Sequence, residues 1–159
     1  MYYGQAGGKN FLLRKWRDLS DDIEVFCDGR DITPKIREHR VHSVLFSNIP
    51  HFSSGTRPWN NSVRVNPEFI FEYDLRFARC DTILTSQFGE QRMDDGLIEV
   101  IGLTTNTLPK LLAGGKGICI GQCKSAVIRT RRTIPMQVDG EASRLNPATI
   151  ELSLLNQVG

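Results

Sequence analysis

Three Asp-Gly pairs in this chain of 159 residues each lie beside a run of β-forming residues, and one of them is followed directly by a glutamate. The three pairs and the glutamate are Asp28-Gly29, Asp95-Gly96, Asp139-Gly140 and Glu141. Asp-Gly is typical of a tight turn between two strands. A carboxylate that a turn presents to a reacting group can also act as a general base. Turn chemistry alone favours a plain turn at all three places.

The run IRTRRT contains a basic cluster of Arg129, Arg131 and Arg132. Because side chains alternate along a strand, we expect Arg129 and Arg131 on one face. Charged runs usually form a solvated face, and this is the favoured interpretation. The alternative is a contact with phosphate or anionic lipid.

Neither the cysteines nor the histidines have the spacing of a metal site. Cys119 and Cys123 fall on a β-like run, where residues four apart lie roughly 13 Å from each other at about 3.3 Å per residue, too far for one zinc ion. His39 and His42 lack a second pair of ligands. The four cysteines are also too few and too scattered for a disulfide framework, which favours a reducing compartment.

Sequence signatures of nucleotide binding and nucleophilic catalysis are incomplete. The run AGGKGIC has Gly117 where a P-loop requires Ser or Thr, and GQAGGKN has Tyr3 where an upstream glycine is required. No Gly-x-Ser-x-Gly turn is present for a nucleophilic serine. Composition is ordinary, with 24% charged residues and a net charge of +2, which argues against disorder and against nucleic-acid binding. Without an apolar run of about 18 residues or a signal peptide, we expect a cytosolic, soluble protein.

Short strand-like runs separated by turns predict the elements that position these residues. The runs are IEVFCD, HSVLFSNI, FIFEY, LIEVIGL, AVIRTR, IPMQV and TIELSLL. They indicate a mainly β domain, an antiparallel sandwich or barrel, with one or two short helices. One helix is expected within residues 9–22, with Leu12, Trp16 and Leu19 on one face. The other is expected within residues 105–115, capped by Thr107, ended by Gly114 and packed through Leu108, Leu111 and Leu112.

Four motifs in a fixed order carry a resemblance to a known family. They are CDG at residues 27–29, NIPHFSSGTRPW at 48–59, QRMDDGLIEVIGLT at 91–104 and IPMQVDGE at 134–141. Together they resemble the C-terminal, or accessory, domain of eukaryotic diacylglycerol kinases. The continuous run GGKGICIGQCKSAVIRTRRTIPMQVDGE is most similar to the zeta and iota type. The resemblance covers nearly the whole chain, so residues 1–159 are interpreted as one accessory domain.

This resemblance implies an antiparallel β-sandwich of the lipid-kinase type that works as one half of an enzyme. In the family, an upstream domain carries the ATP-binding Gly-Gly-Asp-Gly-Thr loop, and the whole kinase uses ATP and Mg²⁺ to convert diacylglycerol to phosphatidic acid in lipid signalling. That loop is not in this sequence, so the chain alone is expected to be inactive. The implied location is cytoplasmic, peripheral at membranes, with the nucleus as a second compartment. The implied partners are the upstream catalytic domain and diacylglycerol at the membrane surface.

The resemblance also assigns roles to particular residues. Phosphoryl transfer needs a carboxylate near the attacking hydroxyl, and Glu141 matches it as the general base, on a turn shaped by Asp139 and Gly140. Asp94 and Asp95 match an acidic motif that belongs to a structural magnesium network in related bacterial lipid kinases. For this motif, a hairpin turn whose aspartates stay in solvent is an equal alternative. Pro50, Gly55 and Thr56 resemble a loop that lines the cleft, and Asp28-Gly29 is interpreted as a turn only.

Two departures from the family and two other functions complete the sequence interpretation. The strand that normally precedes MYYG is missing, which suggests a truncated fragment with an unpaired sheet edge. Residues 62–86 exceed the family's usual linker and are expected to be an inserted loop or a gene-model artefact. One alternative is a β-sandwich module that binds anionic lipid or a protein partner through Arg129 and Arg131. The other is a sphingosine or ceramide kinase fragment, which fits NIPHFSSGT and PMQVDGE less well.

Overall fold

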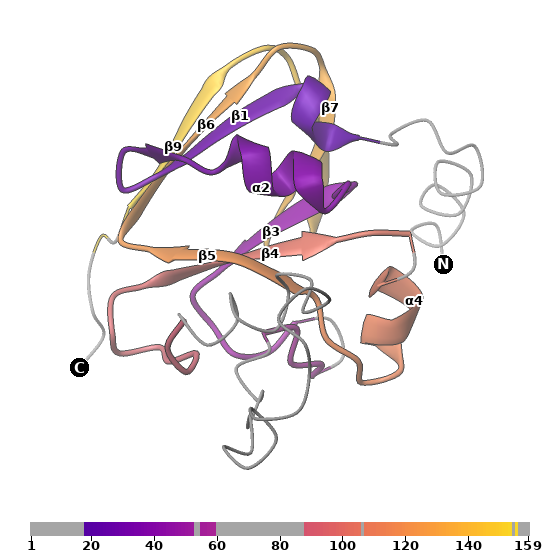
Figure 1. Ribbon diagram of the computed structural model, residues 1–159, viewed down its shortest axis with the longest axis vertical. Coiled ribbons are helices and arrows are strands. Elements are labelled where there is room, and N and C mark those ends of the chain that lie inside the picture. Colours follow the sequence, from indigo (N-terminus) through magenta and orange to yellow (C-terminus); the bar gives the residue numbers. More distant parts are fainter. Residues whose placement is uncertain (1–17, 53–54, 60–87, 106, 154, 156–159) are drawn as a thin grey trace, which may run out of the picture.

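The computed structural model of the chain describes residues 18–52, 55–59, 88–105, 107–153 and 155. In this part of the chain, two antiparallel sheets pack face to face, as Figure 1 shows. One sheet has the strand order β2-β1-β6-β9, and the other has the order β3-β4-β5. The predicted mainly β, antiparallel architecture is confirmed. Residues 60–87, which include the expected insertion at 62–86 and the run FIFEY, lie outside the described residues, as does most of the helix expected within residues 9–22.

The four-stranded sheet has one buried and one exposed face. Its strands are β1 (Ile23–Cys27), β2 (Arg30–Asp31), β6 (Ser125–Thr130) and β9 (Thr149–Ser153). Buried side chains alternate with more exposed ones along β1 and β6. This alternation is what a sheet with a single packed face requires. The two residues between β1 and β2, Asp28 and Gly29, have φ angles of 47° and 78°, which the right-handed twist of a hairpin favours.

The three-stranded sheet is buried on both faces. It consists of β3 (Ser43–Ser47), β4 (Ile98–Leu103) and β5 (Ile118–Cys123). Toward the four-stranded sheet it contributes Val100, Ile120 and Cys123 to a first core. Toward the opposite side, Ile101 and Leu103 pack in a second core with Trp59. Because both faces are covered, β4 is an apolar run interrupted by one charged residue, Glu99.

A β-bulge in β5 separates two cysteines that the sequence places four residues apart. Val100 pairs with Gly121 and Ile101 with Cys119, so Ile120 is the additional residue of the bulge. Cys119 consequently packs in the second core, whereas Ile120 and Cys123 both face the first. The two thiols therefore lie on opposite faces of the sheet, which argues against a shared metal ion at these two residues.

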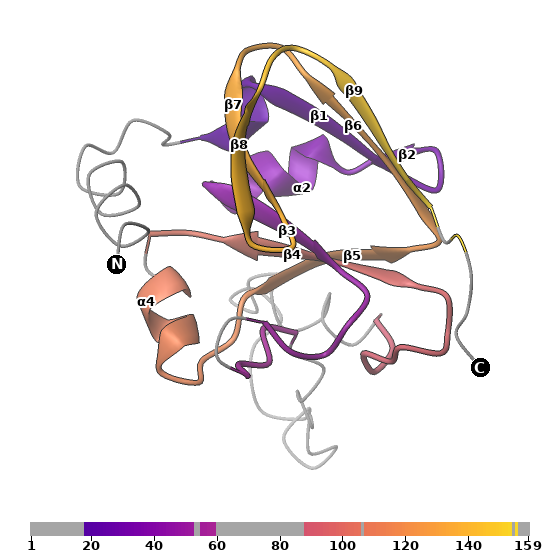
Figure 2. The same ribbon diagram turned by 180° about the vertical axis from the view of Figure 1, so that it is seen from behind.

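A separate hairpin carries the third Asp-Gly pair. It consists of β7 (Ile134–Val138) and β8 (Glu141–Leu145), which pair only with each other among the described strands. Figure 2 shows this hairpin beside the sandwich, running from the level of β6 toward the level of β3 and β4. Strand β8 was not predicted, because EASRL lacks the apolar alternation of a buried strand.

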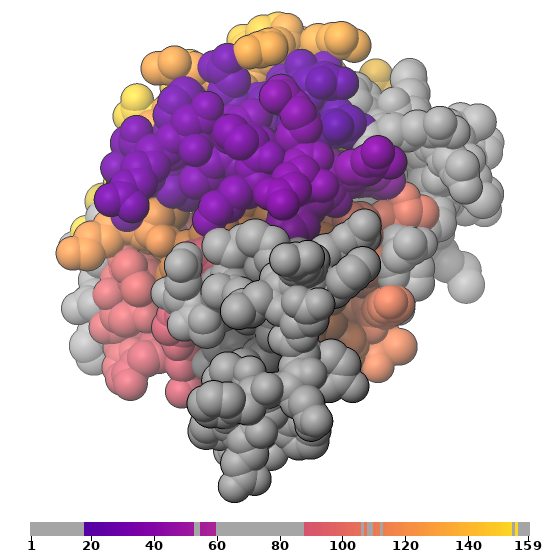
Figure 3. All heavy atoms as spheres, viewed as in Figure 1, coloured from indigo at the N-terminus to yellow at the C-terminus, as the bar shows by residue number. Residues whose placement is uncertain are grey.

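Short helices cover the open sides of the sandwich. A 3-10 turn, η1 (Leu19–Asp21), leads into β1, and α2 (Thr33–Glu38) buries Ile36 in the first core. In the view of Figure 3, the indigo and purple residues, which include η1, β1 and α2, cover much of the upper half of the visible face, below an edge of later residues in orange and yellow. Sequence analysis did not locate α2. Its signal is the run DITP, in which Asp31 Oδ1 accepts the Thr33 amide at 2.9 Å and a proline occupies the first turn.

The predicted second helix is present as α4 (Thr107–Leu112). Gly114 ends it with φ of 82°, and the Gly115 amide donates to the Lys110 carbonyl at 2.7 Å, which is a Schellman ending. Thr107 is not the N-cap. An N-cap side chain accepts a hydrogen bond from an amide two or three residues later, whereas the Thr107 hydroxyl accepts one from the Thr104 amide, three residues earlier. The Leu111 side chain is fully buried, while those of Leu108 and Leu112 lie outside the described side chains.

Candidate functional site

The turn between β7 and β8 presents Glu141 to solvent. Val138 pairs with Glu141, and the two residues between them, Asp139 and Gly140, have φ angles of 46° and 93°. Positive φ at both positions defines a type I′ turn, whose twist matches the flanking strands and fixes the direction of Glu141. Glu141 is exposed, and its carboxylate has no hydrogen-bond or ion-pair partner among the described residues. A fixed, solvated carboxylate is suited to act on a group supplied from outside this part of the chain.

The second Asp-Gly pair lies in the loop that leads into β4, not in a hairpin. Asp95 Oδ1 accepts the Leu97 amide at 2.9 Å, and Gly96 has φ of 70°. The carboxylate of Asp94 binds Arg92 through both oxygens, at 2.8 and 2.6 Å. The hydrogen bond from Arg92 and its charge hold the pKa of Asp94 below its ordinary value.

The donor set in this loop bears on the predicted magnesium site. Both Asp94 oxygens are committed to Arg92, whereas Asp95 uses Oδ1 for the Leu97 amide and is the better candidate ligand. Where the chain is described, no group of three or more His, Cys, Asp or Glu side chains is arranged around a metal position. Mg²⁺ requires about six oxygens and often takes them from one or two carboxylates, waters and substrate phosphates. Asp95 fits such a site only with ligands from outside the described residues, and its role stays a prediction.

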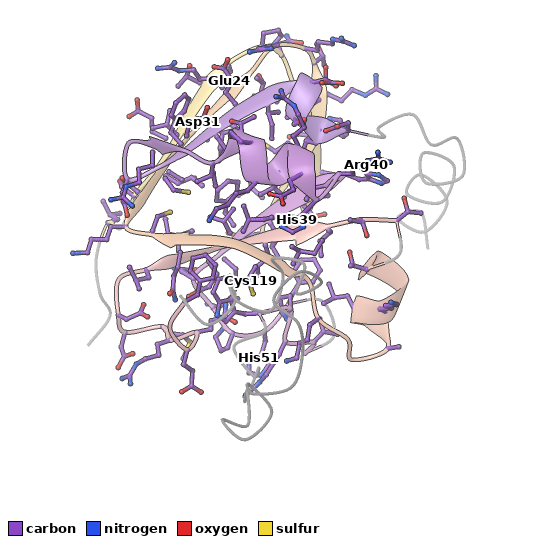
Figure 4. The ribbon with its side chains drawn as sticks, in the orientation of Figure 1. Glu24, Asp31, His39, Arg40, His51 and Cys119 are labelled. Carbon is purple, nitrogen blue, oxygen red and sulfur yellow. The ribbon has the colours of Figure 1, made fainter. Side chains whose placement is uncertain are left out.

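The predicted cleft residues lie in a segment that covers the second core. Gly55 has φ of 78°, and an isolated bridge joins Phe52 to Thr56, with the Phe52 amide 2.7 Å from the Thr56 carbonyl. The segment ends on the buried Trp59, which contacts Phe88 with ring centroids 5.6 Å apart. Figure 4 shows His51, from the same segment, on the far side of the three-stranded sheet from His39.

Glu99 is a buried glutamate that sequence analysis did not single out. It is hydrogen-bonded to the loop that leads into β4 and to β5. Glu99 lies in β4 with none of its surface exposed. Its Oε1 accepts from Gln122 at 3.0 Å, and its Oε2 accepts from Gln91 at 3.1 Å. Burial raises the pKa of Glu99, although the two glutamine hydrogen bonds act in the opposite direction. The only sequence signal was a charged residue inside the apolar run LIEVIGL.

The arginine cluster is paired within the chain. Strand β6 ends at Thr130, so Arg131 lies just beyond the strand on which both arginines were expected. Its guanidinium forms an ion pair with Glu24, which Figure 4 labels on the four-stranded sheet. The guanidinium of Arg129 lies over the ring of Phe26, 5.2 Å from its centroid. Arg132 Nε lies 3.0 Å from Asp22 Oδ1, without hydrogen-bond alignment.

The first Asp-Gly pair has a second structural role beside its turn. Asp28 Oδ1 accepts the amides of Lys124 and Ser125 at 3.0 and 2.9 Å, and the Ser125 hydroxyl at 3.2 Å. These residues form the corner at which the chain passes from β5 in one sheet to β6 in the other. Loss of water raises the pKa of Asp28, but the hydrogen bonds from Ser125 and Lys124 outweigh it and leave the pKa below its ordinary value of 3.8.

The structure joins some of the candidate site residues and leaves others apart. The amide of Gln91 donates to the Ile49 carbonyl at 2.7 Å as well as to Glu99, which ties the loop bearing Pro50 to the loop bearing Asp95. In the described residues, no hydrogen bond or ion pair joins Glu141 to either loop. The described residues therefore hold an exposed carboxylate on the hairpin and, separately, two linked loops on the sandwich.

Comparison with known proteins defines the family. A sequence profile described as "Diacylglycerol kinase accessory domain" matches residues 1–142. The chain is 48% identical over 157 residues to the eye-specific diacylglycerol kinase of Drosophila melanogaster, covering 99% of this chain and 9% of that protein. It is 42% identical over 157 residues to diacylglycerol kinase iota of Homo sapiens, covering 99% of this chain and 13% of that protein. Human diacylglycerol kinase zeta is 36% identical over 157 residues, with 99% and 15% covered.

The chain belongs to the diacylglycerol kinase accessory domain family. The predicted similarity to the zeta and iota type is confirmed. The chain spans only 9% to 15% of the length of these three relatives. No solved structure matches the chain. Among the described residues, no helix is long and apolar enough to cross a membrane.

Proposed function

We propose that this chain is the accessory half of an ATP-dependent diacylglycerol kinase, which transfers a phosphoryl group to diacylglycerol and forms phosphatidic acid. Family membership supports the reaction class. The short span relative to its kinase relatives and the missing Gly-Gly-Asp-Gly-Thr loop support the division of labour, in which another domain binds ATP and Mg²⁺. The complete protein would work in the cytoplasm or nucleus and meet diacylglycerol at the membrane surface. Alone, the chain would make no phosphatidic acid.

The observation that carries this proposal is the Glu141 carboxylate. It stands on a type I′ turn, exposed and without a described partner, at the position that matches the family's Asp-Gly-Glu motif. In the complete enzyme Glu141 would accept the proton of the diacylglycerol hydroxyl while the hydroxyl oxygen attacks the terminal phosphorus of ATP, the bond from that phosphorus to the bridging oxygen breaks, and ADP leaves. An exposed carboxylate suits this role, because the substrate hydroxyl must reach it from outside the described part of the chain.

Replacing the carboxylate by an amide tests the proposal. Glu141→Gln in the full-length protein is expected to lower kcat by about 100-fold or more, because general-base contributions are typically of that size. Thermal unfolding should be unchanged, since the side chain is exposed. Glu151→Gln is the matched control, because Glu151 is an exposed glutamate on β9. Activity is measured as phosphatidic acid formed from diacylglycerol in mixed micelles with ATP and Mg²⁺.

Two results would contradict the proposal. A folded Glu141→Gln protein with a rate near that of the wild type would remove Glu141 from the mechanism. Phosphatidic acid synthesis by the purified 159-residue chain would show that the chain needs no separate ATP-binding domain.

A further inference from the structure

A continuous chain of hydrogen bonds runs through Glu99 and connects the two loops over the second core. On one side, Gln91 Nε2 bridges Glu99 Oε2 at 3.1 Å and the Ile49 carbonyl at 2.7 Å. On the other side, Gln122 Nε2 donates to Glu99 Oε1 at 3.0 Å, and Gln122 Oε1 accepts the Gly89 amide at 3.0 Å. Both arms start from one buried carboxylate and end on the backbone of a surface loop.

A buried carboxylate without a cationic partner is costly. Glu99 is fully buried in the middle of a three-stranded sheet, and in the described structure both of its oxygens are held by neutral amides. An apolar residue would suit the same face, where Ile101 and Leu103 belong to the second core. Burying a charge in this way lowers stability unless its hydrogen bonds compensate. A carboxylate at this position is explained if its hydrogen bonds to Gln91 and Gln122 hold the loops in place, which an apolar residue could not do.

The arm through Gln91 fixes the orientation of the Ile49 carbonyl in the loop that bears Pro50. The Ile49 carbonyl accepts from Ser47 Oγ at 2.8 Å as well as from Gln91, so its direction is fixed from two sides. Ile49 precedes Pro50, and a residue before proline is restricted to extended conformations. Fixing the Ile49 carbonyl therefore also fixes where Pro50 lies. The Ile49 side chain is 51% exposed, so the loop presents an apolar surface outward.

We propose that Glu99 is a positioning residue for lipid substrate: through Gln91 it holds Ile49 and Pro50 in the orientation that contacts diacylglycerol. This inference rests on the proposed function, since it assigns a substrate contact to the same enzyme. Glu99 does not touch the substrate and acts only through Gln91. The arm through Gln122 has the same chemistry but holds Gly89, whose carbonyl accepts Trp59 Nε1 at 3.1 Å, and so serves the fold.

The two arms provide a matched pair of substitutions. Gln91→Met and Gln122→Met each keep the length of the side chain and remove one amide donor to Glu99. Each leaves the other arm intact, so a general loss of stability would affect both variants alike. Glu99 itself is left unchanged, because a substitution at a fully buried site can prevent folding.

Hydrogen exchange in the 159-residue chain tests the positioning role without any enzyme assay. The Phe52 amide, which donates to Thr56, reports on the loop, and the Gly89 amide reports on the other arm. Gln91→Met is expected to speed exchange at Phe52 by about fivefold, the effect of losing the hydrogen bond to the neutral Ile49 carbonyl, with little change at Gly89. Gln122→Met should do the reverse. Equal effects of both variants at both amides would overturn the proposal.

Kinetics of the full-length protein test the substrate contact. Gln91→Met should raise KM for diacylglycerol by about fivefold, with KM for ATP and kcat changed less than twofold, because only lipid binding loses a fixed contact. Gln122→Met should leave all three within about twofold. A normal KM for diacylglycerol in a Gln91→Met protein whose Phe52 amide exchanges faster would overturn the substrate contact. If the wild-type full-length protein made no phosphatidic acid, the proposed function would fail, whereas the exchange result would still stand.

Discussion

At the scale of single residues, the two hairpin Asp-Gly pairs have the same backbone and different surroundings. Asp28 and Asp139 have φ angles of 47° and 46°, and each is followed by a glycine with positive φ. The Asp28 carboxylate binds the corner between β5 and β6, whereas the Asp139 side chain is exposed beside Glu141. The same Asp-Gly dipeptide thus connects two sheets at Asp28-Gly29 and presents the Glu141 carboxylate at Asp139-Gly140.

This contrast predicts different effects of the same substitution. Asp28→Asn should lower the free energy of unfolding by about 1 kcal/mol at pH 7, because an amide accepts the Lys124 and Ser125 hydrogen bonds less strongly. Asp139→Asn should change it by less than about 0.5 kcal/mol, since asparagine also suits a type I′ turn. Urea unfolding of both variants measures the difference. Equal losses would mean that the turn, and not the corner, depends on the carboxylate.

The pH dependence has a definite sign. The folded pKa of Asp28 lies below its ordinary value of 3.8, so this carboxylate stabilises the fold above that pH. The contribution is lost as the pH falls through the folded pKa. Between pH 5 and pH 2, roughly the range that spans these pKa values, Asp28→Asn should therefore lose less stability than the wild type. A parallel loss in both proteins would contradict this assignment.

At the scale of elements, the two glycines just before and in the middle of β5 differ in the space available for a side chain. A Cβ added to Gly117, just before the strand, would lie 2.4 Å from Ile101 Cγ2. A Cβ added to Gly121, within the strand, would meet its nearest atom, Ile32 Cδ1, at 3.9 Å. The entry to β5 is thus closed to larger residues because the strand passes close to β4, while its middle has room for a methyl group.

The two glycines give a prediction for this element. Gly117→Ala should destabilise the domain by about 1 to 3 kcal/mol through overpacking against Ile101. Gly121→Ala should be neutral or stabilise by about 0.5 kcal/mol, because it restricts the unfolded chain without a clash. Thermal unfolding of the two variants is the measurement. A destabilising Gly121→Ala would show that the bulge beside it does not accept a side chain.

At the scale of the whole molecule, the first core makes the two sheets interdependent. It receives Val25 and Ile128 from the four-stranded sheet and Val100 and Ile120 from the three-stranded sheet. The second core lies on the outer face of the three-stranded sheet and includes Trp59, with Phe52 packed against it. Unfolding either sheet would expose the first core, so we expect both sheets to unfold together.

A core substitution tests this cooperativity. Ile120→Ala should lower the free energy of unfolding by about 2 to 5 kcal/mol, since Ile120 is 1% exposed. Hydrogen exchange should accelerate by the same factor in β1 and β6 as in β4. Ile49→Ala, at a position that is 51% exposed, should stay within about 0.5 kcal/mol of the wild type. Faster exchange confined to the three-stranded sheet would contradict a shared core.

Local chemistry was sufficient to predict most of the described strands, the turns at Asp28-Gly29 and Asp139-Gly140 and α4, whereas Asp95-Gly96 lies in a loop and not in a hairpin turn. Apolar runs mark β1, β3, β4, β6, β7 and β9, and Gly114 marks the end of α4. Strand β8 and helix α2 were missed because neither has an apolar pattern of its own, and both are held by pairing or packing with other parts of the chain. The roles predicted for Glu141, Asp95 and the cleft residues came from ordered motifs, and they stay predictions.

The sequence by itself determined the family, through four motifs in a fixed order, and the antiparallel β class and the tight turn before Glu141, because strand patterns and turn residues are local. Only the tertiary structure decided that Arg131 pairs with Glu24, that Asp28 holds the corner between the sheets, and that Glu99 is buried between Gln91 and Gln122. In the sequence, Gln91 and Glu99 are 8 positions apart, Asp28 and Ser125 are 97 apart, and Glu24 and Arg131 are 107 apart. These contacts depend on how the two sheets pack against each other. That packing follows from burying both cores at once rather than from any local sequence pattern.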